Sequence, residues 1–131
     1  MKSWIIPCSP KKYDVEAAFE ALSKINWKQT ANYQVGDVVY IYVGCPVKAI
    51  LFKCRVTKVN LERFDIDTLK HVLDGRDYLD SYKTMELELI RKYDPGVLTL
   101  RALQANGLTG TVRGPRTVPA TLGHLISTLG D

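Results

Sequence analysis

The spacing of apolar residues along the chain predicts four strands. β-Branched and aromatic residues fill positions 38–43, a composition that favours a pleated strand, and a Gly-Cys-Pro turn closes it. Apolar and polar residues alternate over 50–57 and again over 85–89, which is typical of strands with one buried face. A short apolar run at 4–6 meets two prolines and predicts a first strand that ends in a turn. The buried face of the 50–57 strand is expected to carry Ile50, Phe52, Cys54 and Val56.

Helical spacing begins after Asp14. Apolar residues recur with the period of a helix from this point, and the Asp14 side chain can accept a hydrogen bond from the first free backbone N–H groups. We therefore expect a helix that starts at Asp14 and ends near Ile25. Residues 26–32 follow neither period and are rich in side chains that prefer loops, so they predict a connection that carries Trp27.

Two further helices are predicted near the end of the chain. Thr99 is placed to cap a short helix, and Asn106-Gly107 supplies its stop in the left-handed conformation. The final helix starts at Pro119, and its apolar residues form one stripe. Before these helices, residues 61–83 are mostly polar and predict a long connection with one short helix or strand.

The order of these elements predicts an α+β fold, because it lacks the regular strand–helix alternation of a Rossmann fold. A mixed, curved sheet or small β-barrel with packed helices fits this order. A length of 131 residues with 46% hydrophobic content suits one domain that spans 1–131. No apolar run is long enough to cross a bilayer and no signal peptide is recognisable, so we expect a cytoplasmic protein with no membrane contact.

Charge and cysteine content limit the kinds of ligand and metal that the chain is expected to bind. The formal net charge of +4 and the pI of about 9.0 fit a weak attraction to phosphate, which many unrelated proteins share. The three cysteines lie far apart without a CxxC pair, so we expect no metal site and no cofactor. Cys8 and Cys54 have apolar neighbours and are expected to be unreactive core residues. The glycine-rich phosphate motifs and the GxSxG motif of common enzymes are absent from the sequence.

The beginning of the chain resembles the beginning of EVE domains. Positions 4–14 read Trp-Ile-Ile-Pro-Cys-Ser-Pro-Lys-Lys-Tyr-Asp, in which a tryptophan-led strand runs into a polar turn before a helix. Trp27, Gly36-Asp37, the aromatic run 40–42 and the arginine-rich turn 113–118 follow in the order of that family. EVE domains belong to the PUA-like superfamily, together with YTH and ASCH domains. The resemblance therefore implies a PUA-like fold with a pocket that receives a base flipped out of nucleic acid.

A flipped base presents flat faces and a hydrogen-bonding edge, so its reader needs an aromatic plane and short polar groups. We expect Trp27 to stack on the base, and Ser9, Gln29 and Tyr42 to meet its edge. Ordinary structural roles stay open as alternatives: Trp27 in the core, Ser9 in a turn and Tyr42 packed across the sheet. The side chains expected either to follow the phosphates or to be solvated surface charge are Lys53, Arg55, Arg113 and Arg116.

Three functions stay open from the sequence. The leading hypothesis is a binding module without enzymatic activity that recognises a modified, flipped base in DNA or RNA. The second is an ASCH-like amidohydrolase that acts on a modified nucleoside, with Lys28, Glu86 or Glu88 beside the pocket as acid or base. The third is a protein-interaction module that works with a restriction or defence protein.

Overall fold

The fold is built on one curved sheet of six strands, in the order β2-β5-β4-β3-β1-β6. A computed structural model describes residues 1–75 and 83–130 of the chain. The elements are β1 (Ser3–Cys8), α1 (Val15–Ala21), β2 (Lys24–Lys28), β3 (Val38–Val43), β4 (Ala49–Leu61), α2 (Ile66–Leu69), β5 (Thr84–Lys92), α3 (Leu100–Ala105), β6 (Arg116–Thr117) and α4 (Ala120–Thr128). Strands β2 and β6 lie at opposite edges, so within the described residues the sheet stays open. This arrangement confirms the α+β prediction with a curved sheet.

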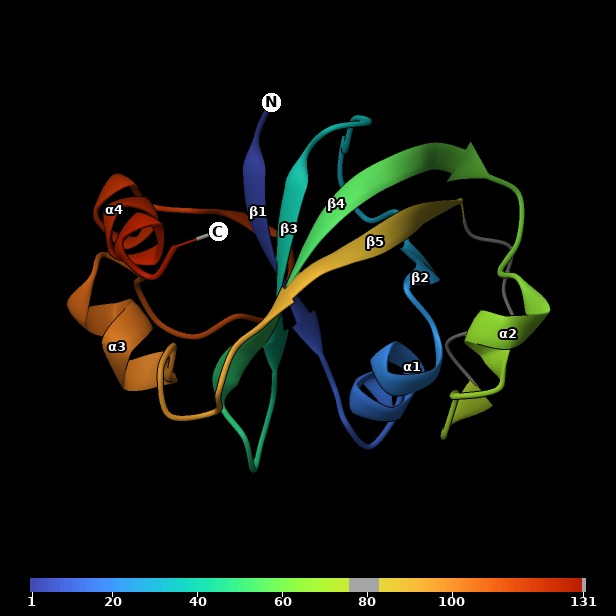
Figure 1. Ribbon diagram of the computed structural model, residues 1–131, viewed down its shortest axis with the longest axis horizontal. Helices are drawn as coiled ribbons and strands as arrows, with labels where there is room; N and C mark the ends of the chain where they lie inside the picture. Colours follow the sequence, from blue (N-terminus) through green and yellow to red (C-terminus); the bar gives the residue numbers. More distant parts are fainter. Residues whose placement is uncertain (76–82, 131) are drawn as a thin grey trace.

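Helices flank the sheet on both sides and create two separate cores. Figure 1 shows α1 and α2 on one side of the sheet and α3 and α4 on the other. Neighbouring residues of β3 belong to different cores, because Ile41 shares the first core with Phe19 of α1, whereas Tyr40 shares the second core with Leu103 of α3. Since both faces of β3 are covered, residues 39–43 are all buried. Burial on both faces explains the unbroken apolar run in the sequence.

One residue of the predicted β4 face points the other way. Phe52 and the alternating residues after it face the first core as predicted, but Ile50 packs in the second core. Ile41 stands opposite Phe52 while Tyr42 stands opposite Ile50, so Leu51 is an extra residue in β4. A bulge of this kind reverses the alternation of side chains, and the alternation in the sequence does not reveal it.

The prediction of a helix that continues to Ile25 is wrong. Helix α1 ends at Ala21, Leu22 has extended backbone angles, and residues 24–28 form the edge strand β2, part of which was expected to be a loop. β2 pairs antiparallel with β5, and Ile25 is completely buried opposite Leu87. The helical spacing continues in the sequence past the end of α1 because α1 and β2 both direct apolar side chains into the first core. Tertiary pairing therefore overrides the local pattern.

Local capping signals are confirmed at three positions. The Asp14 carboxylate accepts a hydrogen bond from the Ala17 N–H at 3.1 Å, and the Thr99 hydroxyl accepts one from the Ala102 N–H at 3.2 Å. Gly107 has a φ of +104°, a backbone conformation that side chains with a Cβ rarely adopt. These residues set the starts of α1 and α3 and the turn after α3.

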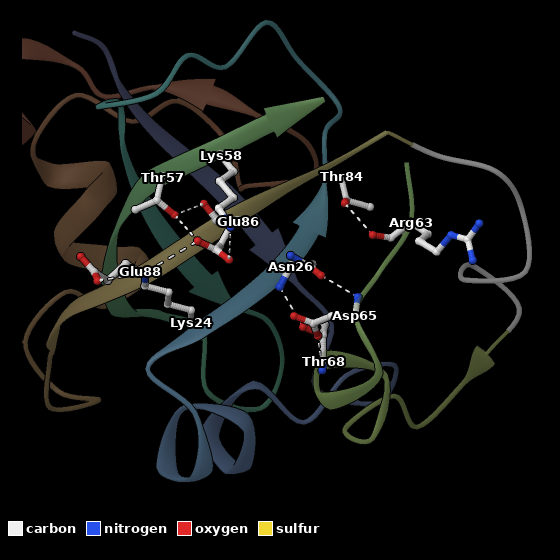
Figure 2. Close-up of polar contacts among 10 residues, drawn as sticks. All are labelled: Lys24, Asn26, Thr57, Lys58, Arg63, Asp65, Thr68, Thr84, Glu86 and Glu88. Atoms are coloured by element: carbon white, nitrogen blue, oxygen red, sulfur yellow. Dashed lines mark hydrogen bonds and ion pairs between the residues drawn. The ribbon is translucent and has the colours of Figure 1, made fainter. Parts of the chain in front are cut away.

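The polar stretch after β4 contains one short helix, α2, as predicted. The Asp65 carboxylate caps α2 by accepting from the Thr68 N–H at 2.7 Å, and the Thr68 hydroxyl accepts from the Asn26 N–H of β2 at 2.9 Å (Figure 2). These bonds hold the connection against the outer edge of β2. Residues 76–82 of the predicted connection lie outside the described residues. Among the helices that the structure describes, none has the length and apolar character to cross a membrane.

Candidate functional site

A cavity of about 510 Å³ lies at the carboxyl end of β1, where this strand runs into a turn. Strand β2 contributes a second wall, and the loop 113–115 before β6 contributes a third. Sites for small organic ligands commonly enclose about 300–1,000 Å³, so this volume suits such a ligand. We call it the Trp27 cavity, and its lining residues are Ile6, Pro7, Cys8, Ser9, Lys12, Tyr13, Asn26, Trp27, Lys28, Thr30, Phe64, Arg113, Gly114 and Pro115.

Trp27 is an aromatic residue of the cavity wall. Its side chain is half-buried, because it packs against the first core and also lines the cavity. The Tyr13 ring meets the indole edge-on, with ring centroids 5.6 Å apart and an interplanar angle of 82°. The indole Nε1–H donates a hydrogen bond to no described residue. Trp27 therefore combines a ring held by its neighbours with a donor that a ligand can use.

Polar groups from two elements meet at the same cavity. The Ser9 carbonyl accepts from the N–H groups of Lys12 and Tyr13 at 3.0 and 3.1 Å, which forms the turn, and Ser9 itself is exposed. Asn26 is 4% exposed, and its Oδ1 accepts from the Asp65 N–H at 2.6 Å. Because that N–H requires an oxygen, the orientation of the amide is defined, and its Nδ2 has no acceptor among the described residues. A hydroxyl and an amide donor are thus available to a ligand.

The Trp27 cavity is positively charged. Lys12, Lys28 and Arg113 line it, and no aspartate or glutamate of the described residues does. Arg113 is exposed and forms no hydrogen bond or ion pair with another described residue. A concave surface with charges of one sign raises the local concentration of counter-ions, so this cavity favours anionic ligands such as phosphates.

Of the four predicted ligand residues, two line the Trp27 cavity and two do not. The two that line it are Ser9 and Trp27. Gln29 instead exchanges two hydrogen bonds with Asn60, because its Nε2 donates to Oδ1 at 2.9 Å and its Oε1 accepts from the backbone N–H at 2.7 Å. Tyr42 is 4% exposed, packs in the second core and lines a neighbouring cavity.

The predicted phosphate-binding residues are also divided. Arg113 lines the Trp27 cavity, whereas the Arg116 guanidinium donates to the carbonyl of Thr109 in its own loop. Lys53 and Arg55 alternate along β4 with side chains of the first core, so they project from the opposite face. The Trp27 cavity lies on the side of the first core, and neither Lys53 nor Arg55 lines it.

Sequence reasoning does not identify several lining residues. Asn26 was expected in a loop, and its burial follows only from the pairing of β2 with β5. Phe64 reaches the cavity from the stretch between β4 and α2, where a lone aromatic residue in a polar segment is the available signal. Lys12 is an ordinary surface lysine in the sequence. Its place beside Ser9 depends on the turn at the end of β1.

The residues of the amidohydrolase alternative do not meet in one cavity. Lys28 lines the Trp27 cavity, whereas Glu86 lines a different cavity beside α2. The Glu86 carboxylate lies 3.9 Å from the Lys24 ammonium and 4.0 Å from that of Lys58, and the Glu88 carboxylate lies 3.9 Å from Lys24 (Figure 2). Neither carboxylate lines the Trp27 cavity. This geometry does not favour the amidohydrolase alternative.

Thiol alkylation tests how closed the Trp27 cavity is. Cys8 lines the cavity but is 4% exposed, and burial, together with the nearby Asp14 charge, raises the pKa of its thiol to about 12. Burial also raises the pKa of the Cys54 thiol. We therefore expect iodoacetamide at neutral pH to modify the exposed Cys45 alone in the folded protein, and all three cysteines after denaturation. Rapid modification of Cys8, detected by peptide mass spectrometry, would contradict this.

The open sheet with helices on both sides is the PUA-like fold, which solved structures share with this chain. The ASCH protein of Zymomonas mobilis superposes with a TM-score of 0.68 at 15% identity, covering 98% of this chain and 95% of that chain. A hypothetical protein from Leishmania major has a TM-score of 0.63 at 16% identity, with 98% and 94% covered. A protein from Agrobacterium tumefaciens has a TM-score of 0.63 at 12% identity, with 99% and 94% covered.

At these low identities the likeness concerns the fold alone. No protein-family model matches the sequence, and no curated protein matches it. The PUA-like fold implied by the sequence resemblance is therefore confirmed, whereas membership of the EVE family stays a prediction.

Proposed function

We propose that this chain is a binding module without enzymatic activity that receives one flipped, modified base of a nucleic acid in the Trp27 cavity. The observation that carries the proposal is the half-buried Trp27 side chain, whose indole N–H has no acceptor among the described residues, in a cavity lined by cations. The PUA-like fold shared with the ASCH structure supports nucleic acid as the class of ligand. RNA and DNA both offer such a base, and the test below compares them.

Stacking on Trp27 accounts for much of the binding energy in this proposal. The stacking of a base on an aromatic side chain contributes about 1–3 kcal/mol, while unstacking a base from its neighbours costs a few kcal/mol. Hydrogen bonds from Ser9 and Asn26 to the edge of the base offset the part of the unstacking cost that stacking on Trp27 does not cover. A modification that changes the shape or the donors of that edge alters this balance, so we propose that one modified base is preferred.

The proposal is tested by titrating the protein into labelled RNA and DNA oligonucleotides of equal length. Each carries one central cytosine or adenine that is unmodified, methylated or replaced by an abasic site. We expect one modified base to bind more tightly than its unmodified counterpart, and the abasic strand to bind about 5- to 100-fold more weakly than the preferred base. Equal affinity for every strand, the abasic one included, would remove the proposal.

The proposal also states that the protein does not alter the bound base chemically. Incubation of the protein with the preferred oligonucleotide, followed by mass spectrometry of the nucleosides, is expected to return the starting material. Hydrolytic loss of an exocyclic amine from the base would instead support the amidohydrolase alternative. The restriction or defence partner stays a prediction of the sequence.

A further inference from the structure

Two further cavities adjoin the Trp27 cavity. The 109–116 cavity, of about 490 Å³, is lined by residues 109–111 and 113–116 and shares Arg113 with the Trp27 cavity. The Tyr42 cavity, of about 310 Å³, lies around Tyr42 and shares Ser9 with the Trp27 cavity. The two outer cavities share no lining residue with each other. Each of the two therefore adjoins the Trp27 cavity, and we refer to the three cavities together as the row.

The lining of this row is positive throughout. Lys11 lines the Tyr42 cavity, Lys12 and Lys28 line the Trp27 cavity, and Arg116 lines the 109–116 cavity. Arg113 lines both the Trp27 cavity and the 109–116 cavity. In the described parts of the chain, no aspartate or glutamate lines any of the three. In the cavity beside α2, by contrast, acidic residues outnumber basic ones, because Glu62, Asp65, Asp67 and Glu86 line it together with Lys58 and Arg63. A polyanion that enters the Trp27 cavity is therefore favoured along the row and disfavoured toward α2.

Arg113 and Arg116 differ in what they contact. Arg113 stands where two cavities meet and has no hydrogen-bond or ion-pair partner among the described residues. The Arg116 guanidinium donates to the carbonyl of Thr109, to the hydroxyl of Thr109 at 3.1 Å and to the carbonyl of Thr111 at 3.3 Å. Its backbone also pairs with Ile5 of β1. Arg116 thus ties its loop to the sheet, while Arg113 is available for a phosphate.

We infer that the bound strand continues past the flipped nucleotide in both directions and occupies all three cavities. This inference rests on the proposed function. The flipped nucleotide fills the Trp27 cavity. The nucleotide on one side of it lies in the 109–116 cavity, with a phosphate at Arg113. The nucleotide on the other side lies in the Tyr42 cavity, beside Lys11. The ligand is then a single strand with one nucleotide per cavity, in place of a free nucleoside. Arg116 is a positioning residue that acts through its loop.

A ligand series tests the inference by isothermal titration calorimetry. The series comprises the preferred nucleoside, its 5′-monophosphate, its 3′-monophosphate and a trinucleotide with the same central base. We expect the trinucleotide to bind about tenfold or more tightly than either monophosphate at low salt, because both flanking cavities are then filled. The trinucleotide affinity is also expected to fall more steeply with salt than the affinities of the monophosphates.

Single substitutions then assign the two flanks. Arg113→Ala and Lys11→Ala are each expected to weaken trinucleotide binding about fivefold and to reduce the slope of log affinity against log salt by about 0.7, the value for one phosphate contact on a single strand. The matched control is Arg101→Ala, which removes the same charge from the exposed side of α3 and should change neither value. Wild-type affinity and slope in both flank variants would overturn the assigned path.

Arg116→Lys separates positioning from phosphate contact. Lysine keeps the positive charge, but it lacks the planar guanidinium group that donates to the carbonyls of Thr109 and Thr111. We expect Arg116→Lys to weaken trinucleotide binding about as much as Arg116→Ala, with the salt slope of the wild-type protein retained in both. Full affinity in Arg116→Lys, or a reduced slope in Arg116→Ala, would overturn the positioning role.

The outcomes separate this inference from the proposed function. If the nucleoside, the trinucleotide and the longer oligonucleotide with the same base all fail to bind, the proposed function is wrong and the inference falls with it. If the nucleoside binds as tightly as the trinucleotide, the proposed function stands and the three-cavity path is wrong.

Discussion

Replacing Trp27 with alanine is expected to weaken binding of the preferred oligonucleotide by about 5- to 100-fold. This range corresponds to the loss of one base–aromatic stacking contact of about 1–3 kcal/mol. The indole is the large aromatic surface that combines cavity exposure with an unused donor, whereas Tyr13 beside it is only 2% exposed. Fluorescence anisotropy with the labelled strand measures the change.

Two controls separate lost stacking from a damaged fold. Trp27→Phe keeps a smaller ring and is expected to recover part of the affinity. The abasic oligonucleotide should bind Trp27→Ala and the wild-type protein equally, because it offers no base to stack. Trp27 also packs against the first core, so the melting temperatures of both variants are compared with that of the wild type. Unchanged affinity of Trp27→Ala for the base-containing strand would contradict the stacking role.

Replacing Asp37 with alanine is expected to lower the free energy of unfolding by about 3 kcal/mol and the melting temperature by roughly 10 °C. The buried Asp37 carboxylate accepts from the Lys2 N–H at 3.0 Å, the Trp4 indole N–H at 3.0 Å and the Gln34 N–H at 3.1 Å. It thereby joins β1 to the segment before β3. Alanine would leave the buried indole N–H of Trp4 without its acceptor.

Thermal and urea unfolding measure this loss. Asp94→Ala is the matched control, because Asp94 is exposed and its side chain has no partner among the described residues. We expect that control to stay close to the wild type. A melting temperature of Asp37→Ala equal to that of Asp94→Ala would show that the carboxylate is not needed for the fold.

The pH dependence of stability gives a second readout for Asp37. Burial favours a higher pKa, but the hydrogen bonds from Lys2, Trp4 and Gln34, with the positive amino terminus, outweigh it and hold the pKa of this carboxyl below its usual 3.8. The folded state therefore binds fewer protons than the unfolded state near that pH. The stabilisation is fully present above the unfolded pKa and is lost as pH falls through the folded pKa. Asp37→Asn should lose this part of the acid dependence, measured by urea unfolding between about pH 3 and pH 6.

The resemblance in the sequence and the local patterns place the central features of the molecule. The apolar run that becomes β3, the caps at Asp14 and Thr99 and the turn at Gly107 are all readable, because each depends on residues a few positions apart. The resemblance to EVE domains also selects Ser9 and Trp27, which the fold brings to one cavity. Nothing local shows that Leu51 is an extra residue in β4.

Local patterns are enough to predict the class of fold, most strands and the helix caps, since periodicity and capping act over a single turn or strand. Three features become visible only in the folded chain: residues 24–28 form a strand, Gln29 hydrogen-bonds Asn60, and Asn26 and Phe64 line the Trp27 cavity. These features depend on the pairing of β2 with β5 and on contacts between segments far apart in the chain. Such contacts become favourable only after the sheet has formed, so no short stretch of sequence encodes them.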